Sequence, residues 1–275
     1  MNEAFNYNSD YFEGISGTWT KLSYPFISKN LIQNIRGKKV NRSLDLGCGY
    51  GVYAEVLLDH SAEVYGLDIS EDACNVCREK GYSKVFNANV DAIPINDGTI
   101  DFVFTTEVLE HILDYDKMLS EIHRMLSKDG TLVLTTTCYS TSIFVAINDP
   151  QFRLRNYLDY FGGFFSKKTR DNFVRKFCFT FLGGHYHGFL PGKLTKKITD
   201  MGFTVAEKKL FTVHELLFYK DGKNLFKKVF LKETGWPLHK RVLAFPASVF
   251  FMTANFLVNH VFAFKNNILI VAKKA

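Results

Sequence analysis

The chain has 275 residues, of which 47% are hydrophobic and 23% are charged, and this composition excludes a disordered protein and favours one packed α/β domain with insertions. The net charge of +6 divides unevenly, because residues 1–150 carry 12 Lys and Arg against 21 Asp and Glu, whereas residues 151–275 carry 22 against 7. The basic second half predicts an anionic contact, which nucleic acid, a phospholipid surface or a phosphorylated substrate would each provide.

In chain order, residues 1–36 are rich in aromatic side chains and are predicted to form a helical cap. From residue 40 onward strand and helix patterns alternate. Strands are predicted at 43–47, 63–68, 84–87, 100–106 and 131–137, with helices at 50–60, 70–81 and 114–126. This alternation predicts a doubly wound, mostly parallel, Rossmann-like sheet with helices on both faces.

The regular alternation stops after residue 137. Residues 138–190 are predicted to form an insertion on the substrate side of the sheet, and 194–209 restore a helix followed by a strand. Residues 211–265 form a second, basic and apolar insertion, and ILIVAKK (268–274) is predicted to close the sheet as an antiparallel last strand. We therefore predict a single domain over 1–275, with its cofactor-binding core at 40–137.

Two further features bear on the compartment. The first residues, MNEAFNYNSD, contain neither a basic nor an apolar stretch, which predicts no signal peptide and a cytoplasmic protein. Five cysteines are present, and Cys74 and Cys77 form a Cys-x-x-Cys pair. Because no second such pair completes a zinc site, we interpret these two as partly buried helix residues with reduced thiols.

A glycine-rich loop follows the first predicted strand. Gly47, Gly49 and Gly51 alternate with other residues, and a backbone without β-carbons lets a ligand approach closely. A dinucleotide fingerprint would need glycine where Val52 stands. Asp45 beside the loop suits a ligand that bears an ammonium group better than a pyrophosphate, because like charges repel.

Asp68 ends the second predicted strand, 21 residues after Gly47. A carboxylate at this position can accept hydrogen bonds from both hydroxyls of a ribose. The alternative is an acidic residue that only favours the start of the following helix. The glycine loop nearby favours the ligand role.

The segments LDLGCGYG, YGLDIS, NVDAIP, IDFVFTTEVLEHI and LSKDGTLVLTTT together resemble the class I S-adenosylmethionine-dependent methyltransferases, especially the ubiquinone and menaquinone biosynthesis group. The resemblance covers about 40–137 and resumes in HGFLPGKLTKKITDMGFTV and the last strand. It implies that the methionine end of S-adenosylmethionine lies against four residues of the first motif, namely Asp45, Gly47, Cys48 and Gly49. It also implies that Asp68 holds the ribose and that Ile69 packs on the adenine.

The same resemblance assigns the remainder of the cofactor site. Family members usually have an acidic residue where this chain has Asn89, so Asn89 and the backbone of Val90 would contact the adenine amino group, with Asp91 as a substitute. Thr106 and Glu107, just past the fourth strand, would border the sulfonium.

Glu107, Glu110 and His111 form a Glu-x-x-Glu-His motif. On a helix these residues would share one face, where they could bind a divalent cation. The motif is similar to that of metal-dependent members, but many members with this pair use no metal. The alternatives are that His111 and Glu107 act as base or orient the substrate, or that they are structural.

His185 and His187 in GGHYHGF are further candidates. In the resembling group a histidine lies near the acceptor before a similar turn, and His187 fits that place as a catalytic residue. The alternative is a loop histidine whose ring is satisfied by backbone groups.

Val242–Phe264 is a run of 23 residues without Asp, Glu, Lys or Arg. A helix of this length would be roughly 35 Å long, enough to cross a bilayer. Pro246, Asn255 and Asn259 interrupt the run, and the last strand must return to the same sheet. We therefore expect peripheral membrane contact through 225–265, with a buried cover over the acceptor as the alternative.

The leading hypothesis is O-methylation of a lipid-linked or membrane-proximal acceptor, such as a quinone precursor or a polyprenyl-linked sugar, at the cytoplasmic face of a membrane. The alternatives are a methyltransferase of soluble sugars or metabolites, an RNA methyltransferase, and a cofactor-binding regulatory subunit. RNA is disfavoured, because no RNA-binding module is recognised and 242–264 is too apolar to face phosphates. The intact glycine loop and Asp68 disfavour the regulatory subunit.

Overall fold

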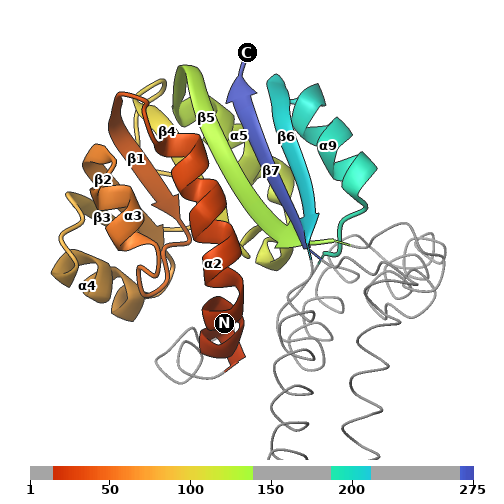
Figure 1. Ribbon diagram of the computed structural model, residues 1–275. Coiled ribbons are helices and arrows are strands. Elements are labelled where there is room, and N and C mark those ends of the chain that lie inside the picture. The colour runs from red at the N-terminus through yellow and green to blue at the C-terminus, as the bar shows by residue number, and fades with distance from the viewer. Residues whose placement is uncertain (1–14, 139–186, 212–266) are drawn as a thin grey trace, which may run out of the picture.

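The computed structural model describes residues 15–138, 187–211 and 267–275 (Figure 1). Their centre is a seven-stranded sheet with the order β3-β2-β1-β4-β5-β7-β6. The strands are β1 (Val40–Leu46), β2 (Ser61–Asp68), β3 (Lys84–Asn87), β4 (Ile100–Thr106), β5 (Leu126–Thr137), β6 (Phe203–Phe211) and β7 (Asn267–Lys274).

The sheet is mostly parallel, as the alternating pattern predicts. The pairs β1·β2, β1·β4, β2·β3 and β4·β5 are parallel, whereas β7 is antiparallel to both β5 and β6. The prediction of a Rossmann-like sheet with an antiparallel last strand is confirmed. The strand order reverses between β1 and β4, and in such sheets ligands bind at the carboxyl ends of the strands beside this point.

Helices cover both faces of the sheet. They are α2 (Ile15–Ile35), α3 (Ala54–Leu58), α4 (Glu71–Glu79), the short 3₁₀ helix η1 (Leu109–His111), α5 (Tyr115–Met125) and α9 (Pro191–Asp200). One core cluster joins α2 and α3 to the sheet through Leu31, Leu57 and Phe104. A second cluster joins α5 and α9 to the other face through Ile122 and Ile198.

Several local predictions are confirmed. The side chain of Ser70 caps α4 by accepting a hydrogen bond from the Ala73 amide at 3.4 Å, and Gly81 follows the helix with a φ of 91°. Cys74 and Cys77 are buried on α4 as free thiols. The helix predicted over 50–60 is shorter than expected, since α3 covers only Ala54–Leu58 and the residues before it form turns.

The predicted insertions at 138–190 and 211–265, together with His185, Cys178 and the apolar run 242–264, lie almost wholly outside the described residues. Their attachment points are described. Thr137 at the end of β5 pairs with Asn267, and Asn267 pairs with Phe211 at the end of β6. Both segments therefore leave the sheet at the edge where the parallel strands end. Among the helices that the structure describes, none has the length and apolar character needed to cross a bilayer.

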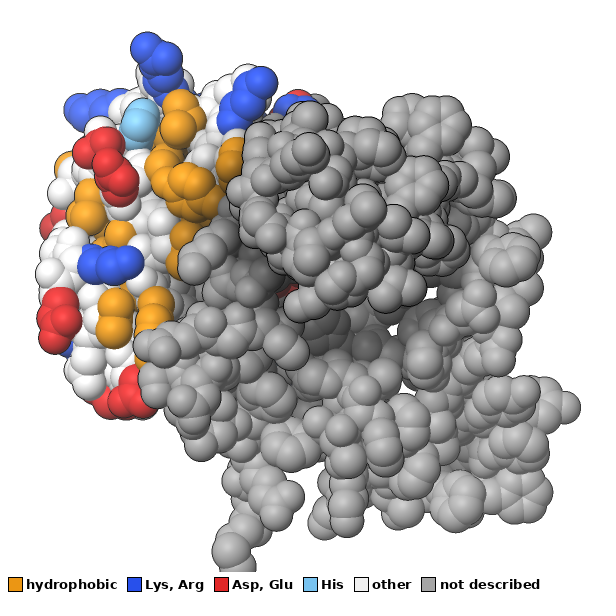
Figure 2. Space-filling view, turned by 60° about the horizontal axis from the view of Figure 1, so that its bottom comes forward, with side chains coloured by type: hydrophobic (Ala, Val, Ile, Leu, Met, Phe, Trp, Pro, Cys, Tyr) orange, Lys and Arg blue, Asp and Glu red, His pale blue; other side chains and the backbone are white. Residues whose placement is uncertain are grey.

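The described part of the chain carries 19 Lys and Arg and 19 Asp and Glu, so its side chains are formally neutral overall. Figure 2 shows charged side chains of both signs scattered over the visible described surface, with hydrophobic side chains between them. The basic excess of the chain therefore belongs to the sequence outside the described residues. Segments 139–186 and 212–266 together carry 15 Lys and Arg against 6 Asp and Glu.

Replacement of Ile122 by alanine tests how α5 is held to the sheet. Ile122 is fully buried in the core, so we expect Ile122→Ala to reduce the free energy of unfolding by about 2–5 kcal/mol. Urea denaturation measures this loss. Ser120→Ala, at an exposed position of the same helix, should change stability by no more than about 0.5 kcal/mol, and an equal loss in both variants would contradict the packing described.

Candidate functional site

The glycine loop connects β1 to α3 at the carboxyl edge of the sheet. Gly47 has a φ of 73°, and a β-carbon at this position would lie 2.2 Å from Cγ2 of Val108. Neither the backbone conformation nor the space allows a side chain. The loop therefore packs directly on the turn that follows β4, and this contact joins two of the segments that the sequence assigned to one site.

Asp68 joins the glycine loop to the start of α4. Its Oδ2 accepts a hydrogen bond from the Gly49 amide at 2.9 Å, and its Oδ1 accepts one from the Ser70 amide at 2.9 Å. Burial raises the pKa of this carboxyl, although both amide bonds favour its charged form. The carboxylate therefore lies at the end of β2, directly beside the loop.

An exposed apolar side chain stands next to this carboxylate. Ile69 is 52% exposed, which is unusual for an isoleucine beside a buried strand. The side-chain amide of Asn87 donates to the Ile69 carbonyl at 2.8 Å, and the backbone amide of Ala88 donates to the Asp68 carbonyl at 3.1 Å. The segment that carries exposed Asn89 and buried Val90 therefore starts beside Asp68 and Ile69.

Asp45 occupies a different environment from the other polar residues of the first motif. It is only 2% exposed, and its Oδ2 accepts a hydrogen bond from the hydroxyl of Tyr82 at 2.7 Å. Burial raises the pKa of Asp45 to about 7, with Tyr82 acting in the opposite direction. Tyr82 therefore holds the Asp45 carboxyl in the protein interior, two residues before the glycine loop begins. The contact of Asp45 with an ammonium group stays a prediction.

The turn after β4 carries a strained glutamate. Glu107 has a φ of 53°, a region that costs a non-glycine residue of order 1–3 kcal/mol. Thr135 on β5 fixes the side chain, because its hydroxyl donates to Oε1 of Glu107 at 3.2 Å and lies 2.7 Å from the Thr106 hydroxyl. Strain of this kind that is held by neighbouring groups is typical of functional sites.

A second glutamate lies against the first. Glu110 is fully buried, and its Oε2 accepts a hydrogen bond from the Thr136 hydroxyl at 2.7 Å. Its Oε1 meets no conventional donor. Burial, the charge of Glu110 and a hydrogen bond between the two carboxyls raise the pKa of Glu107 well above its ordinary value. A proton on Glu107 removes the repulsion between the two neighbouring carboxylate charges.

Comparison with known proteins identifies this arrangement. The family model "Methyltransferase domain" matches residues 44–134. The ubiquinone biosynthesis O-methyltransferase of Glaesserella parasuis is 26% identical over 169 residues, which cover 54% of this chain and 70% of that protein. The ubiquinone/menaquinone biosynthesis C-methyltransferase UbiE of Campylobacter jejuni is 27% identical over 186 residues, which cover 64% and 75%.

This chain contains a methyltransferase domain and is an S-adenosylmethionine-dependent methyltransferase. Its fold agrees with that assignment. Phosphoethanolamine N-methyltransferase 2 of Haemonchus contortus, solved in complex with S-adenosyl-L-methionine, superimposes with a TM-score of 0.58 at 16% identity, covering 99% of this chain and 60% of that chain. S-Adenosylmethionine is accordingly the cofactor, and the glycine loop without β-carbons, the Asp68 carboxylate and the exposed Ile69 fit its amino-acid, ribose and adenine parts.

In this methyltransferase the Glu-x-x-Glu-His motif does not form one helical face, so that prediction is wrong. The left-handed conformation of Glu107 precedes η1, and the helix contains only Leu109, Glu110 and His111. Glu110 turns inward to β5. Within the described ranges no three His, Cys, Asp or Glu side chains gather in a way that could hold a metal ion, so Glu107, Glu110 and His111 are not brought together as ligands.

His187 is bound by backbone groups. Its amide donates to the Glu110 carbonyl at 3.2 Å, its Nε2 lies 3.1 Å from the Leu113 carbonyl, and its ring packs edge-on against Tyr115. These contacts match the alternative of a backbone-satisfied loop histidine, and they tie His187 to the segment that carries the glutamates. His111 is partly buried on η1, and its catalytic role stays a prediction.

Sequence reasoning missed three residues that hold the site together: Tyr82, Thr135 and Thr136. Tyr82 is 37 positions from its partner Asp45, and the threonines are more than 25 positions from the glutamates that they contact. The only signal was the run Thr135–Thr137 at the end of a predicted strand, which placed hydroxyls at the carboxyl edge of the sheet without naming their partners.

Replacement of Gly47 by alanine tests the contact between the two motifs. The added β-carbon would overlap Val108, so we expect Gly47→Ala to weaken the binding of S-adenosylhomocysteine at least tenfold in isothermal titration calorimetry. Gly81→Ala is the matched control, since Gly81 also has a positive φ but has nothing within 4 Å of an added β-carbon. An unchanged affinity in Gly47→Ala would contradict the proposed site.

The raised pKa of Glu107 predicts a pH-dependent stability. A carboxyl whose pKa is raised by folding stabilises the protein fully below its unfolded pKa, and that contribution is lost as the pH rises through the folded pKa. Glu107→Gln cannot lose a proton, so its melting temperature relative to that of the wild type should rise as the pH increases above 4.5, the ordinary pKa of glutamate. Glu121→Gln should show the opposite sign in a lower pH range: Arg124 lowers the pKa of Glu121 from 4.5, so the wild type should gain on this variant as the pH rises towards about 4.5 and stay parallel to it above that. Parallel pH profiles for wild type and Glu107→Gln would refute the assignment.

Proposed function

We propose that this methyltransferase methylates a hydroxyl oxygen of a lipid-linked or membrane-proximal acceptor, such as a quinone precursor or a polyprenyl-linked sugar. The observation that carries the hydroxyl is the pair formed by half-buried Glu107 and fully buried Glu110 beside the glycine loop. A hydroxyl is a poor nucleophile until its proton leaves, and a carboxyl pair that holds a single proton keeps one basic oxygen available for it.

S-Adenosylmethionine supplies a methyl group that is already activated as a sulfonium substituent. The chain's own residues then have two tasks, which are to align the reactants and to accept the proton of the acceptor. In this proposal Asp45, Gly47, Cys48 and Gly49 border the amino-acid part of the cofactor. Asp68 binds the ribose, Ile69, Asn89 and Val90 border the adenine, and Thr106 faces the reacting centre.

The proton balance of the transfer follows from the same pair. As the acceptor oxygen forms its bond to the methyl carbon, its hydroxyl proton passes to the ionised carboxylate of the Glu107–Glu110 pair and later leaves to solvent. Thr135 and Thr136 hold the two carboxyls in place by donating to them. His111, on the adjoining 3₁₀ helix, is the candidate to orient the acceptor hydroxyl, and His187 fixes the backbone at Glu110.

Two observations support a lipid-borne acceptor. The relatives of this chain include proteins named for ubiquinone and menaquinone biosynthesis. The segments attached at the carboxyl edge, 139–186 and 212–266, also contain the basic excess of the chain and the apolar run 242–264. Basic and apolar residues together favour contact with an anionic membrane surface, which we propose for 225–265 at the cytoplasmic face.

The test uses S-adenosylmethionine with a labelled methyl group, the purified enzyme and an extract of the source cells, separated afterwards into organic and aqueous phases. We expect label in the organic phase. Asp68→Ala, which lacks the ribose carboxylate, is the control and should give at least tenfold less label. Label that stays in the aqueous phase would overturn the lipid-borne acceptor and favour a soluble sugar, a metabolite or RNA.

Because relatives include C-methyltransferases as well as an O-methyltransferase, the methylated atom is tested separately. Hydriodic acid cleaves methyl ethers and releases volatile methyl iodide, whereas a methyl group on carbon stays with the product. Release of the label as methyl iodide is the expected result. Retained label would replace the proposed oxygen acceptor by a carbon acceptor, for which the same carboxyl pair could deprotonate a ring hydroxyl.

A further inference from the structure

The connection between β3 and β4, residues 88–99, contains no helix or strand. Near its start lie Asn89 and Val90, the residues proposed to border the adenine. A segment without regular structure has backbone amides and carbonyls that no ladder satisfies, and buried ones need other partners. Val90, Ile93 and Ile95 are buried in the core, so this connection needs polar partners at its inner turns.

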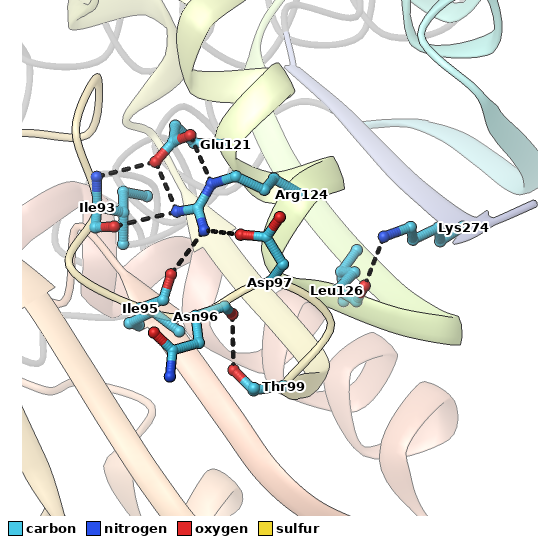
Figure 3. Close-up of polar contacts among 9 residues, drawn as sticks. All are labelled: Ile93, Ile95, Asn96, Asp97, Thr99, Glu121, Arg124, Leu126 and Lys274. Atoms are coloured by element: carbon cyan, nitrogen blue, oxygen red, sulfur yellow. Dashed lines mark hydrogen bonds and ion pairs between the residues drawn. The ribbon is translucent and has the colours of Figure 1, made fainter.

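Arg124 on α5 supplies most of these partners (Figure 3). Its Nη1 donates to the Ile95 carbonyl at 2.7 Å and to the Asp97 carboxylate at 2.6 Å, and its Nη2 donates to the Ile93 carbonyl at 3.0 Å. The Arg124 carbonyl also accepts a hydrogen bond from the Gly98 amide at 3.0 Å. A single residue therefore binds the connection at four points.

Glu121, one helical turn earlier, completes the arrangement. Its two carboxylate oxygens accept hydrogen bonds from Nε and Nη2 of Arg124, both at 2.8 Å. Its Oε2 also accepts a hydrogen bond from the Ile93 amide at 3.0 Å. Ile93 is thus held through both its amide and its carbonyl. The fork-like pairing fixes the plane of the guanidinium, which lysine cannot reproduce.

Burial and charge show that this is more than a flexible surface pair. The side chains of Arg124 and Glu121 are only 29% and 20% exposed. The hydrogen bond from Arg124 lowers the pKa of Glu121, so the pair stays charged at neutral pH. By contrast, Arg78 and Glu71 on α4 form a pair whose side chains are 42% and 56% exposed, and Arg78 donates to the side chains of Glu71 and Asn75 on the same helix.

We propose that Arg124, held by Glu121, is a positioning residue that sets the conformation of residues 88–97 and thereby the affinity for the adenosine part of the cofactor. This inference rests on the proposed assignment of Asn89 and Val90 to the adenine. Arg124 itself stays on α5 and touches no ligand. Its effect reaches the cofactor through Asp91 and Ala92, the two residues between Val90 and Ile93.

The distances make this coupling physically reasonable. Asn89 and Val90 are separated from the fixed Ile93 by only Asp91 and Ala92, and the other end of the segment is tied to Asp68 through the Ala88 amide. A short stretch anchored at both ends has few conformations to choose from. When the anchor at Ile93 is lost, the stretch must be ordered as the ligand binds, and this loss of conformational entropy weakens the binding affinity.

The test measures the binding of S-adenosylhomocysteine and of 5′-methylthioadenosine, which contains the adenosine part without the amino acid. Titration calorimetry is done well below each variant's unfolding midpoint, so that only folded protein is compared. For Arg124→Lys we expect both dissociation constants to increase about tenfold and by the same factor. Arg78→Lys, which disturbs the exposed pair on α4, should leave both unchanged.

Glu121→Gln provides a second variant, because glutamine keeps an oxygen for the Ile93 amide but loses the ion pair. We expect both dissociation constants to increase by a smaller factor, about threefold. If Arg124→Lys lowers only the melting temperature and leaves both affinities unchanged, Arg124 is merely structural and the inference is wrong. If only S-adenosylhomocysteine binding weakens, Arg124 acts on the amino-acid part, which also overturns it. Failure of the wild type to bind either compound would instead refute the proposed cofactor site itself.

Discussion

The close approach of Gly47 to Val108 is the constraint on which the rest of the site depends. The backbone of the first loop and the turn after β4 meet where even a methyl group would overlap. Immediately before Val108, Glu107 has the left-handed backbone conformation. The glycine loop and the turn that carries Glu107 are therefore packed directly against each other.

Polar contacts at the carboxyl edge of the sheet connect the glycine loop and the two glutamates to the neighbouring strands. Asp68 ties the glycine loop to α4, Thr135 ties Glu107 to β5, and Thr136 does the same for Glu110. Each contact links neighbouring strands at the point where they end. Such cross-links hold a site in place before any ligand arrives, which reduces the ordering that binding requires.

The sheet and the glycine loop could be predicted from the sequence because strand and helix periodicities, and glycines after a strand, are local signals. Asp68 was found because it ends a predicted strand at a fixed distance from the loop. The geometry of Glu107 and Glu110 could not be predicted, since helical spacing assumes a helix, whereas the backbone at Glu107 is left-handed and its side chain is held by Thr135, 28 positions away. The roles of Tyr82 and Thr136 likewise depend on pairings between distant segments.

The proposed role of the carboxyl pair as proton acceptor would limit the acceptors that the enzyme can use well. An amine that is already neutral, or a thiolate, needs no base, and for such acceptors these two glutamates would only add a cost of desolvation. A hydroxyl or a phenol gives up a proton as its oxygen is methylated, and the pair can take that proton while its net charge changes from −1 to 0. A buried site tolerates the neutral state better than the charged one, so proton transfer into the pair becomes more favourable as the acceptor excludes water. An apolar acceptor with a single hydroxyl, as in a prenylated phenol, combines both requirements.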